Sequence, residues 1–188
     1  LAGLAGYHNS FSGAFVFDDV RAIVQNPAVH GLDNLKTALF PPPGSFFFAR
    51  PLINFSLSVN YAFGGLDVWG YHAVNLGIHV LAALVLFGIV RRTFLSERLK
   101  DRYGHAALWL ALSTALIWTI HPLQTQSVTY IVQRSEALMG LFYLLTFYCV
   151  IRSITGLRKG WWGAAASAAC ELGMGCKAVM GTAPLLIL

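Results

Sequence analysis

Two adjacent carboxylates, Asp18 and Asp19, are the side chains of this 188-residue chain best suited to chemistry. The chain holds only eight acidic residues, and this pair directly follows the apolar stretch 15–17. Neighbouring like charges repel, and apolar surroundings drive one of them toward its neutral form unless cations or polar partners hold it. The residues alone support two interpretations: a catalytic pair, or an N-cap for a short helix over 20–24, where Asp is favoured.

The composition predicts an integral membrane protein. Hydrophobic residues make up 56% of the chain, charged residues 11%, and the mean hydropathy is +0.62. Soluble domains carry about 25% charged residues, roughly twice this fraction. The chain starts with Leu and stops inside an apolar run. We therefore expect a single membrane domain over 1–188 that is truncated at both ends and belongs to a longer protein.

Basic residues are concentrated in two short segments that lie between apolar stretches, as in cytoplasmic loops under the positive-inside rule. Because the positive charges of these segments are explained by membrane orientation, we do not expect nucleic acid as a partner, despite a net charge of +5. The two segments are 91–105, with Arg91, Arg92, Arg98, Lys100 and Arg102, and 152–160, with Arg152, Arg158 and Lys159.

The apolar stretches predict an all-α, polytopic membrane helical bundle. Residues 69–90 carry no charge and are long enough to cross about 30 Å of hydrocarbon as a helix. A second span should stop at His121, because proline disfavours helical geometry in the residue before it. We expect the end of a first helix at 1–6, an outer segment at 7–68, and about five membrane helices in 69–188, namely 69–90, 103–120, 128–151, 161–175 and one starting near 177.

The outer segment, 7–68, should face the non-cytoplasmic side, opposite the basic segments. It carries four acidic residues against three basic ones, including Asp18 and Asp19. Its stretch 41–48, Pro-Pro-Pro-Gly followed by three phenylalanines within the next four residues, suits a segment in the lipid interface. Apolar residues alternate over 51–63, which favours a strand. A lone strand at a membrane edge would leave its backbone unpaired, so we predict a helix there.

Charged residues near the outer ends of two predicted helices are candidates for substrate contacts. Arg134 suits a leaving phosphate, because its guanidinium matches phosphate geometry. The alternative is an arginine that extends to the lipid headgroups, with Glu136 as a structural partner. Intramembrane charges mark functional sites more often than not. Lys177 is open to the same two interpretations.

A polar face on the 69–90 helix carries His72, Asn75 and His79, at positions i, i+3 and i+7. The two histidines are two turns apart, too far for one metal ion, so a polar seam between helices is expected. His121 should lie in the helix-ending turn, with cavity lining as a second role. The cysteines lack metal-ligand spacing and are expected to pack in apolar segments: Cys149, Cys170 and Cys176.

Short motifs follow one another in order along nearly the whole chain. They are Phe15-Val16-Phe17-Asp18-Asp19, Asn26-Pro27, Arg50-Pro51-Leu52, Asn60-Tyr61, Gly70-Tyr71-His72 with Asn75 and His79, and His121-Pro122-Leu123-Gln124-Thr125 through Tyr130, Arg134 and Glu136. This ordered set resembles the transmembrane and tetratricopeptide-repeat O-mannosyltransferase family and its bacterial relatives. The resemblance implies the N-terminal part of a GT-C fold with a long non-cytoplasmic first loop.

The resemblance also implies a reaction: transfer of a sugar, with mannose as the candidate, from a polyprenyl-phosphate donor to protein Ser/Thr hydroxyls. One of Asp18 and Asp19 would transfer the proton, and the other would orient groups or bind a cation. A positioned base contributes about 10²–10⁴-fold in rate. A divalent metal is left open as a cofactor, and no metal ligands are assigned. The expected substrate-binding residues are Arg134, Glu136, His121, Lys177 and His72.

The expected partners are membrane lipid, the lipid-linked donor, an acceptor protein and further membrane subunits. The resemblance implies the inner membrane of a bacterium or the endoplasmic reticulum of a eukaryote. One departure matters: relatives are expected to carry Lys-Glu where this chain has Lys177-Ala178. If that carboxylate holds a metal or the donor, catalysis fails here. The second hypothesis is therefore a truncated or inactive relative that acts as a structural membrane subunit of a larger complex.

Overall fold

The computed structural model describes residues 1–30, 32 and 35–187. Asp33 of the outer segment and Leu188 of the last predicted helix lie outside this part. Every regular element of the described residues is helical, which confirms the all-α prediction. Among the described residues, three segments are long and apolar enough to cross a membrane: Val68–Phe94, Lys100–Ile120 and Ile131–Thr155.

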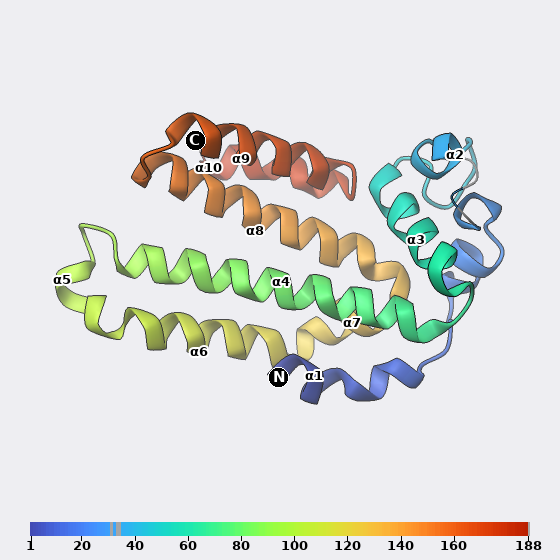
Figure 1. The fold of residues 1–188 in the computed structure, drawn as a ribbon, viewed down its shortest axis with the longest axis horizontal. Coiled ribbons are helices and arrows are strands. Elements are labelled where there is room, and N and C mark those ends of the chain that lie inside the picture. The colour runs from blue at the N-terminus through green and yellow to red at the C-terminus, as the bar shows by residue number, and fades with distance from the viewer. Residues whose placement is uncertain (31, 33–34, 188) are drawn as a thin grey trace.

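Helix α4 (Val68–Phe94) is the axis of the bundle. It packs against α6 (Ala107–Ile120) on one side and α8 (Arg134–Thr155) on the other, and α8 packs against α9 (Lys159–Met174) (Figure 1). The carboxylate of Asp67 accepts a hydrogen bond from the Trp69 N–H at 3.1 Å and so caps the start of α4. At about 1.5 Å per residue, α4 is roughly 40 Å long, which exceeds the ~30 Å hydrocarbon core.

The next two predicted spans are also present. The second comprises α5 (Lys100–Tyr103), a 3-10 turn (Gly104–Ala106) and α6, and it ends at His121, as the following proline predicts. The third starts at Ile131 rather than near 128, because the backbone of Tyr130 is extended and separates α7 (Thr125–Thr129) from the 3-10 turn Ile131–Gln133 that leads into α8.

The fourth and fifth predicted helices are shorter. Helix α9 has 16 residues, about 24 Å at the usual rise per residue. A 3-10 turn (Ala178–Thr182) and α10 (Ala183–Ile187) follow it. That either helix crosses the membrane stays a prediction. All three cysteines are unpaired and buried, as expected for packing residues.

The outer segment, 7–68, folds into short helices and turns. Helix α1 (Ala2–Tyr7) leads into it and packs against α4 and α6. The elements of the segment are 3-10 turns at His8–Ser12 and Pro27–Val29, a π-helical turn at Val20–Val24, α2 (Leu35–Leu39) and α3 (Pro51–Gly64).

Helix α3 confirms the choice of helix over strand. It buries Ile53, Asn54, Leu57 and Ser58, which share one helical face. The alternation in the sequence arose because two of these buried residues are polar. Asn54 and Ser58 both donate hydrogen bonds to the carbonyl oxygen of Ala28, at 3.1 and 3.3 Å.

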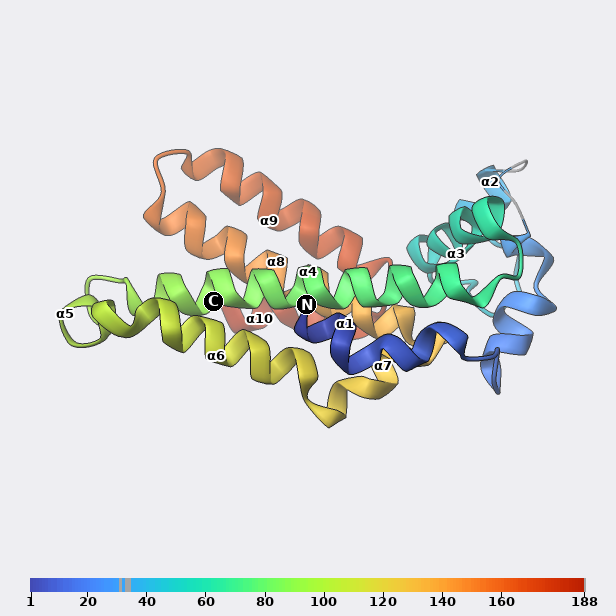
Figure 2. The same ribbon diagram turned by 60° about the horizontal axis from the view of Figure 1, so that its bottom comes forward.

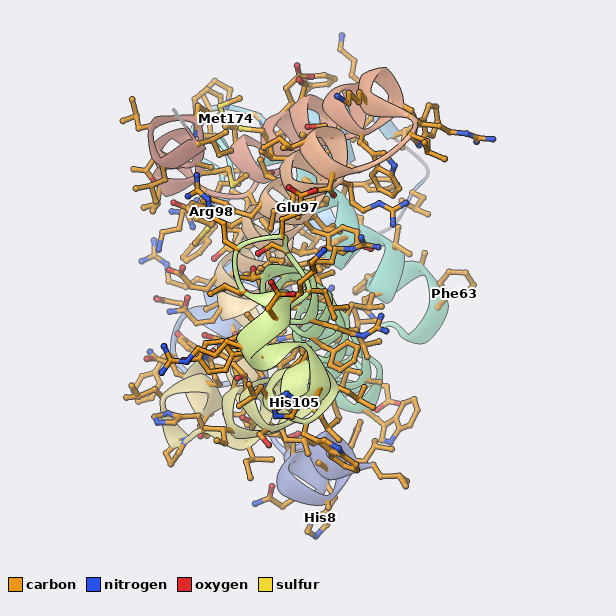
Figure 3. The ribbon with its side chains drawn as sticks, turned by 90° about the vertical axis from the view of Figure 1, so that its left-hand side faces the viewer. His8, Phe63, Glu97, Arg98, His105 and Met174 are labelled. Atoms are coloured by element: carbon orange, nitrogen blue, oxygen red, sulfur yellow. The ribbon has the colours of Figure 1, made fainter. Side chains whose placement is uncertain are left out.

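The two basic segments lie at one end of the bundle, and the outer segment lies at the other. Figures 1 and 2 both place the α4–α5 and α8–α9 connections at the left-hand end, with α2 and α3 at the right. Figure 3 looks onto the basic end, where Glu97, Arg98 and His105 lie on the connection from α4 to α6. The bundle therefore separates the basic residues from the Asp18–Asp19 pair along its long axis.

A close approach of α4 and α8 generates a stability prediction. A Cβ atom at Gly88 would lie 2.9 Å from a ring carbon of Tyr148, whereas one at Gly77, on the same helix, would meet nothing within 4 Å. Gly88→Leu should therefore lower the free energy of unfolding by about 1–3 kcal/mol through overpacking. Gly77→Leu is the matched control and should not. Thermal unfolding of both variants in detergent tests this, and equal melting temperatures would contradict the close approach.

Candidate functional site

The buried carboxylate of Asp19 joins the outer segment to the start of α8. Its side chain is 1% exposed. One oxygen, Oδ1, accepts a hydrogen bond from the Val132 N–H at 2.7 Å, and Oδ2 accepts one from the Val16 N–H at 3.2 Å. Asp19 therefore satisfies a free N–H at the beginning of the helical run that becomes α8.

The interpretation of the pair as an N-cap for the short helix 20–24 is wrong for Asp19. The helix forms at Val20–Val24, with Asp19 immediately before it, but the Asp19 side chain makes no capping hydrogen bond to it. Burial raises the pKa of the Asp19 carboxyl, and the charge of Asp18 adds to this. The N–H donors of Val132, Val16 and Ile131 oppose the rise.

Asp18 has the opposite surroundings. Its side chain is exposed, while its backbone N–H donates a hydrogen bond to the Tyr130 hydroxyl at 3.0 Å. The residue before it, Phe17, has φ of +46° and an 87% exposed side chain. Such a φ is uncommon for a residue with a side chain, and it turns the chain so that one aspartate points inward and its neighbour outward. The two carboxylates thus differ in burial.

Arg134, two residues after the Val132 that contacts Asp19, is fully buried and is surrounded by polar groups. Its Nε donates to Oδ1 of Asn75 at 2.7 Å, Nη1 to the carbonyl oxygen of Ser56 at 3.1 Å, and Nη2 to that of Tyr71 at 3.1 Å. The guanidinium also lies 5.7 Å from the ring centre of Tyr71. These contacts join α8 to α3 and α4.

Both parts of the alternative interpretation of Arg134 are therefore wrong. A fully buried side chain does not reach the lipid headgroups, and Glu136 is not its partner. The guanidinium donors are directed at protein oxygens, so the contacts in hand give Arg134 a positioning role.

Glu136 forms an ion pair with Lys177, which connects the first turn of α8 to the residue before the 3-10 turn at Ala178. Both side chains are 30% exposed, so the pair is open to a ligand from outside. Ala178 is exposed and contributes no carboxylate. Glu136 thus supplies a carboxylate next to Lys177 in a chain that lacks one at position 178.

His72 is buried at a cavity of about 470 Å³ between the start of α4, the outer segment and α7. Its side chain is 2% exposed, and neither ring nitrogen has a hydrogen-bond partner among the described residues. A Cβ at Gly13 would lie 3.0 Å from Nε2, so glycine lets the chain approach the ring closely. No charged side chain lines the cavity, whose polar residues are Tyr7, Asn9, Ser10, His72, Thr125 and Thr129.

The predicted polar seam on α4 is confirmed for two of its members. Asn75 accepts from Arg134, and His79 Nε2 contacts the carbonyl oxygen of Thr119 at 2.9 Å. His121 lies in the helix-ending turn, where its Nδ1 accepts a hydrogen bond from the Leu123 N–H at 3.2 Å. The neighbours of His121, rather than His121 itself, line the His72 cavity. In the part of the chain that the structure describes, His, Cys, Asp and Glu form no group of three that could hold a metal ion.

Sequence reasoning assigned no role to Tyr130, Tyr71 or Ser56. Tyr130 supports the Asp18 backbone, and the other two accept from Arg134 through their carbonyl oxygens. Tyr71 and Tyr130 were visible as members of the ordered motifs. Ser56 accepts mainly through its backbone oxygen, at 3.1 Å, which no residue type indicates, and its hydroxyl lies farther from the same Nη1, at 3.5 Å.

Helices long enough to cross a membrane and a group of buried and exposed polar residues at one end define a helical membrane protein with a candidate site at that end. Comparison with known proteins finds similar sequences along most of the chain. Protein O-mannosyl-transferase TMTC2 of Homo sapiens is 35% identical over 171 residues, and TMTC2 of Mus musculus is 34% identical over the same length. Each alignment covers 86% of this chain and 19% of the relative.

Protein O-mannosyl-transferase Tmtc1 of Drosophila melanogaster is 32% identical over 177 residues, again 86% of this chain and 19% of the relative. The chain belongs to this protein O-mannosyl-transferase family, as its ordered motifs predicted. It spans about a fifth of the length of these relatives. No family model and no solved structure matches the chain.

The contacts of Arg134 generate a second prediction. Arg134→Lys keeps the charge but leaves at least one of the Asn75, Ser56 and Tyr71 oxygens without a donor, and each buried unsatisfied group costs about 1–3 kcal/mol. Thermal unfolding should show a clear loss for Arg134→Lys and a larger one for Arg134→Met. The matched control is Arg21→Lys, because Arg21 is exposed in the same part of the molecule. An Arg134→Lys variant as stable as the control would mean that the network is dispensable.

Proposed function

We propose that this chain is the N-terminal membrane part of a GT-C type protein O-mannosyltransferase. It would transfer mannose from a polyprenyl-phosphate carrier to Ser/Thr hydroxyls of an acceptor protein on the non-cytoplasmic side. The observation that carries the proposal is the unequal pair of carboxylates at the end of the bundle opposite the basic segments. Asp18 is exposed there and Asp19 is held by the start of α8.

In the proposed reaction, Asp18 is the general base. Its exposed carboxylate takes the proton of the acceptor hydroxyl while the hydroxyl oxygen attacks the anomeric carbon of the sugar. The bond between that carbon and the phosphate oxygen breaks, and the phosphate leaves with the electron pair. Asp19 is a positioning residue, because its two hydrogen bonds to backbone N–H groups fix the turn that carries Asp18.

Lys177 is the proposed contact for the leaving phosphate. It is partly exposed and lies beside Glu136 on the first turn of α8. A cation there would stabilise the charge that develops on the phosphate. Arg134, which is enclosed by protein oxygens, is assigned to positioning α8. The cavity at His72 is proposed for the sugar, because its neutral hydroxyl, amide and imidazole groups suit an uncharged hydroxylated ring.

The second hypothesis, an inactive structural subunit, rests on Ala178. The ion pair of Glu136 with Lys177 weakens it, because a carboxylate is present beside the lysine despite that substitution. Transfer activity of the full-length wild-type protein decides between the two. Activity supports the enzyme, and an intact assembly without activity on any lipid-linked sugar supports the structural subunit.

The roles of the pair lead to a kinetic prediction. Asp18→Asn should reduce sugar transfer by the full-length protein at least ~100-fold, about 2.7 kcal/mol of barrier, with little change in melting temperature. Asp67→Asn is the matched control, because Asp67 is an exposed N-cap and Asn caps equally well. Near-wild-type transfer by Asp18→Asn would overturn the assignment of the base.

The same assay separates the role of Asp19. Asn keeps one acceptor oxygen for a backbone N–H, whereas Leu keeps none. A positioning role therefore predicts an intermediate loss of transfer for Asp19→Asn and a much larger one for Asp19→Leu. Equal losses for the two variants would indicate that the charge of Asp19, rather than its hydrogen bonds, is needed.

Sidedness leads to a further prediction. A cysteine placed at Gly44, in the outer segment, should react with a membrane-impermeant maleimide added to the non-cytoplasmic side of sealed vesicles. A cysteine at Ser96, in the α4–α5 connection, should react only after the membrane is opened. The three native cysteines are buried and provide the background. Reversed labelling would place the Asp18–Asp19 pair on the cytoplasmic side and contradict the proposal.

A further inference from the structure

A second cavity, of about 480 Å³, lies at the basic end of the bundle, far from Asp18 and Asp19. Arginines from three parts of the chain reach it: Arg92 from the end of α4, Arg152 from the last turn of α8, and Arg158 from the turn before α9. The cavity has no acidic lining residue, and its other members are Thr155, Gly156, Leu157, Trp161 and Trp162.

Aromatic rings, rather than carboxylates, hold two of these guanidinium groups. Arg152 lies 4.4 Å from the ring centre of Trp162, and Arg92 lies 5.5 Å from that of Tyr148. Within the described part of the chain, none of the three arginines forms an ion pair or donates a side-chain hydrogen bond. The Nε atom of Arg152 is buried and has no partner. A buried donor without an acceptor is costly, so an anionic oxygen that accepts from this Nε would be bound favourably.

Close backbone packing builds this cavity. A Cβ at Gly156 would lie 2.6 Å from the carbonyl oxygen of Arg152 and 3.7 Å from Trp162, so only glycine allows the turn between α8 and α9 to close this tightly. Helices α4 and α8 also approach closely in this region, at Gly88 and Tyr148. Arg92, one turn after Gly88, lies over the ring of the same Tyr148 and lines the cavity. The fold therefore holds Arg92 and Arg152 at the cavity, and Arg158 is exposed at its edge.

The rim of the cavity is apolar and open. Leu157 and Trp161, which line it, are 105% and 70% exposed. Tryptophan is enriched where the hydrocarbon core meets the headgroups, and both flanking helices meet at this end of the bundle. An anion that enters the cavity would thus have cationic donors around it and apolar side chains beside it. These two features complement the anionic phosphate and the apolar acyl chains of a phospholipid.

We propose that this arginine–tryptophan cavity binds the phosphate of an anionic membrane phospholipid. Arg92, Arg152 and Arg158 would donate to the phosphate oxygens, since guanidinium groups make strong charge-assisted bonds to phosphate. The acyl chains would lie along the exposed apolar rim. The proposal does not depend on transferase activity, because it uses none of the residues at the Asp18–Asp19 end. Basic pockets between membrane helices bind anionic headgroups elsewhere by the same physical means.

The test is lipid binding by the purified full-length protein in micelles, followed by native mass spectrometry at about 0.15 M salt, where distant charges are screened. We expect one phosphatidylglycerol to be retained. The variant Arg92→Gln/Arg152→Gln should weaken its retention at least ~10-fold. The matched control is Arg98→Gln/Arg102→Gln, which removes two charges from the same end of the bundle, where Figure 3 labels Arg98 and α5 carries Arg102. Neither residue lines the cavity, so this control should lose less than ~3-fold.

Two further arms distinguish the sources of the anion. Phosphatidylcholine should bind more weakly than phosphatidylglycerol, and millimolar inorganic phosphate should not displace the bound lipid. Displacement by inorganic phosphate would identify a free-anion site and overturn the lipid assignment. Equal losses in the cavity variant and the control would overturn the site itself. If the double variant fails to fold, Arg152→Lys compared with Arg98→Lys gives the same test, because both keep the charge and only the first should weaken binding.

Discussion

A guanidinium buried without a carboxylate partner is the interaction on which the Asp18–Asp19 end depends. Transfer of a charge from water into a protein interior is costly unless polar groups surround it. Arg134 meets this requirement with one amide oxygen, two carbonyl oxygens and the face of Tyr71. Because these groups come from α3 and α4 while the arginine comes from α8, the charge is tolerated only when all three helices are in place.

Asp19 extends the same arrangement to the outer segment. Arg134 joins the first turn of α8 to α3 and α4. Asp19 accepts a hydrogen bond from the N–H of Val132, two residues before Arg134 in the chain. The start of α8 is thus held by a buried cation on one side and a buried carboxylate on the other, and neither is the partner of the other. Asp18 and Lys177 stay accessible, whereas Asp19 and Arg134 are buried in contacts that join different elements.

The sequence predicted the long helices well, because the length of an apolar stretch and a following proline are local properties. It predicted the partners of the charged residues poorly. Glu136 follows Arg134 by two positions, and residues so spaced lie on different sides of a helix, so their proximity in sequence was misleading. The capping interpretation of Asp19 failed because its true donor, Val132, is 113 residues away. The alternation in α3 suggested a strand because Asn54 and Ser58 are buried polar residues whose acceptor, Ala28, belongs to another element.

The distance along the chain between Asp19 and Val132 has a consequence for biosynthesis. A chain made from its N-terminus exposes the Asp18–Asp19 turn early, yet the N–H group that orients this turn is made only after two membrane helices, α4 and α6, have followed. Until the turn at 131–133 and α8 have been made, the Asp19 carboxylate lacks the Val132 donor. The oxygens of Asn75, Ser56 and Tyr71 likewise lack the guanidinium of Arg134. The contacts that orient Asp18 and Asp19 therefore form only after α8 has been made, and Lys177 joins Glu136 later still, because it follows α9 in the chain.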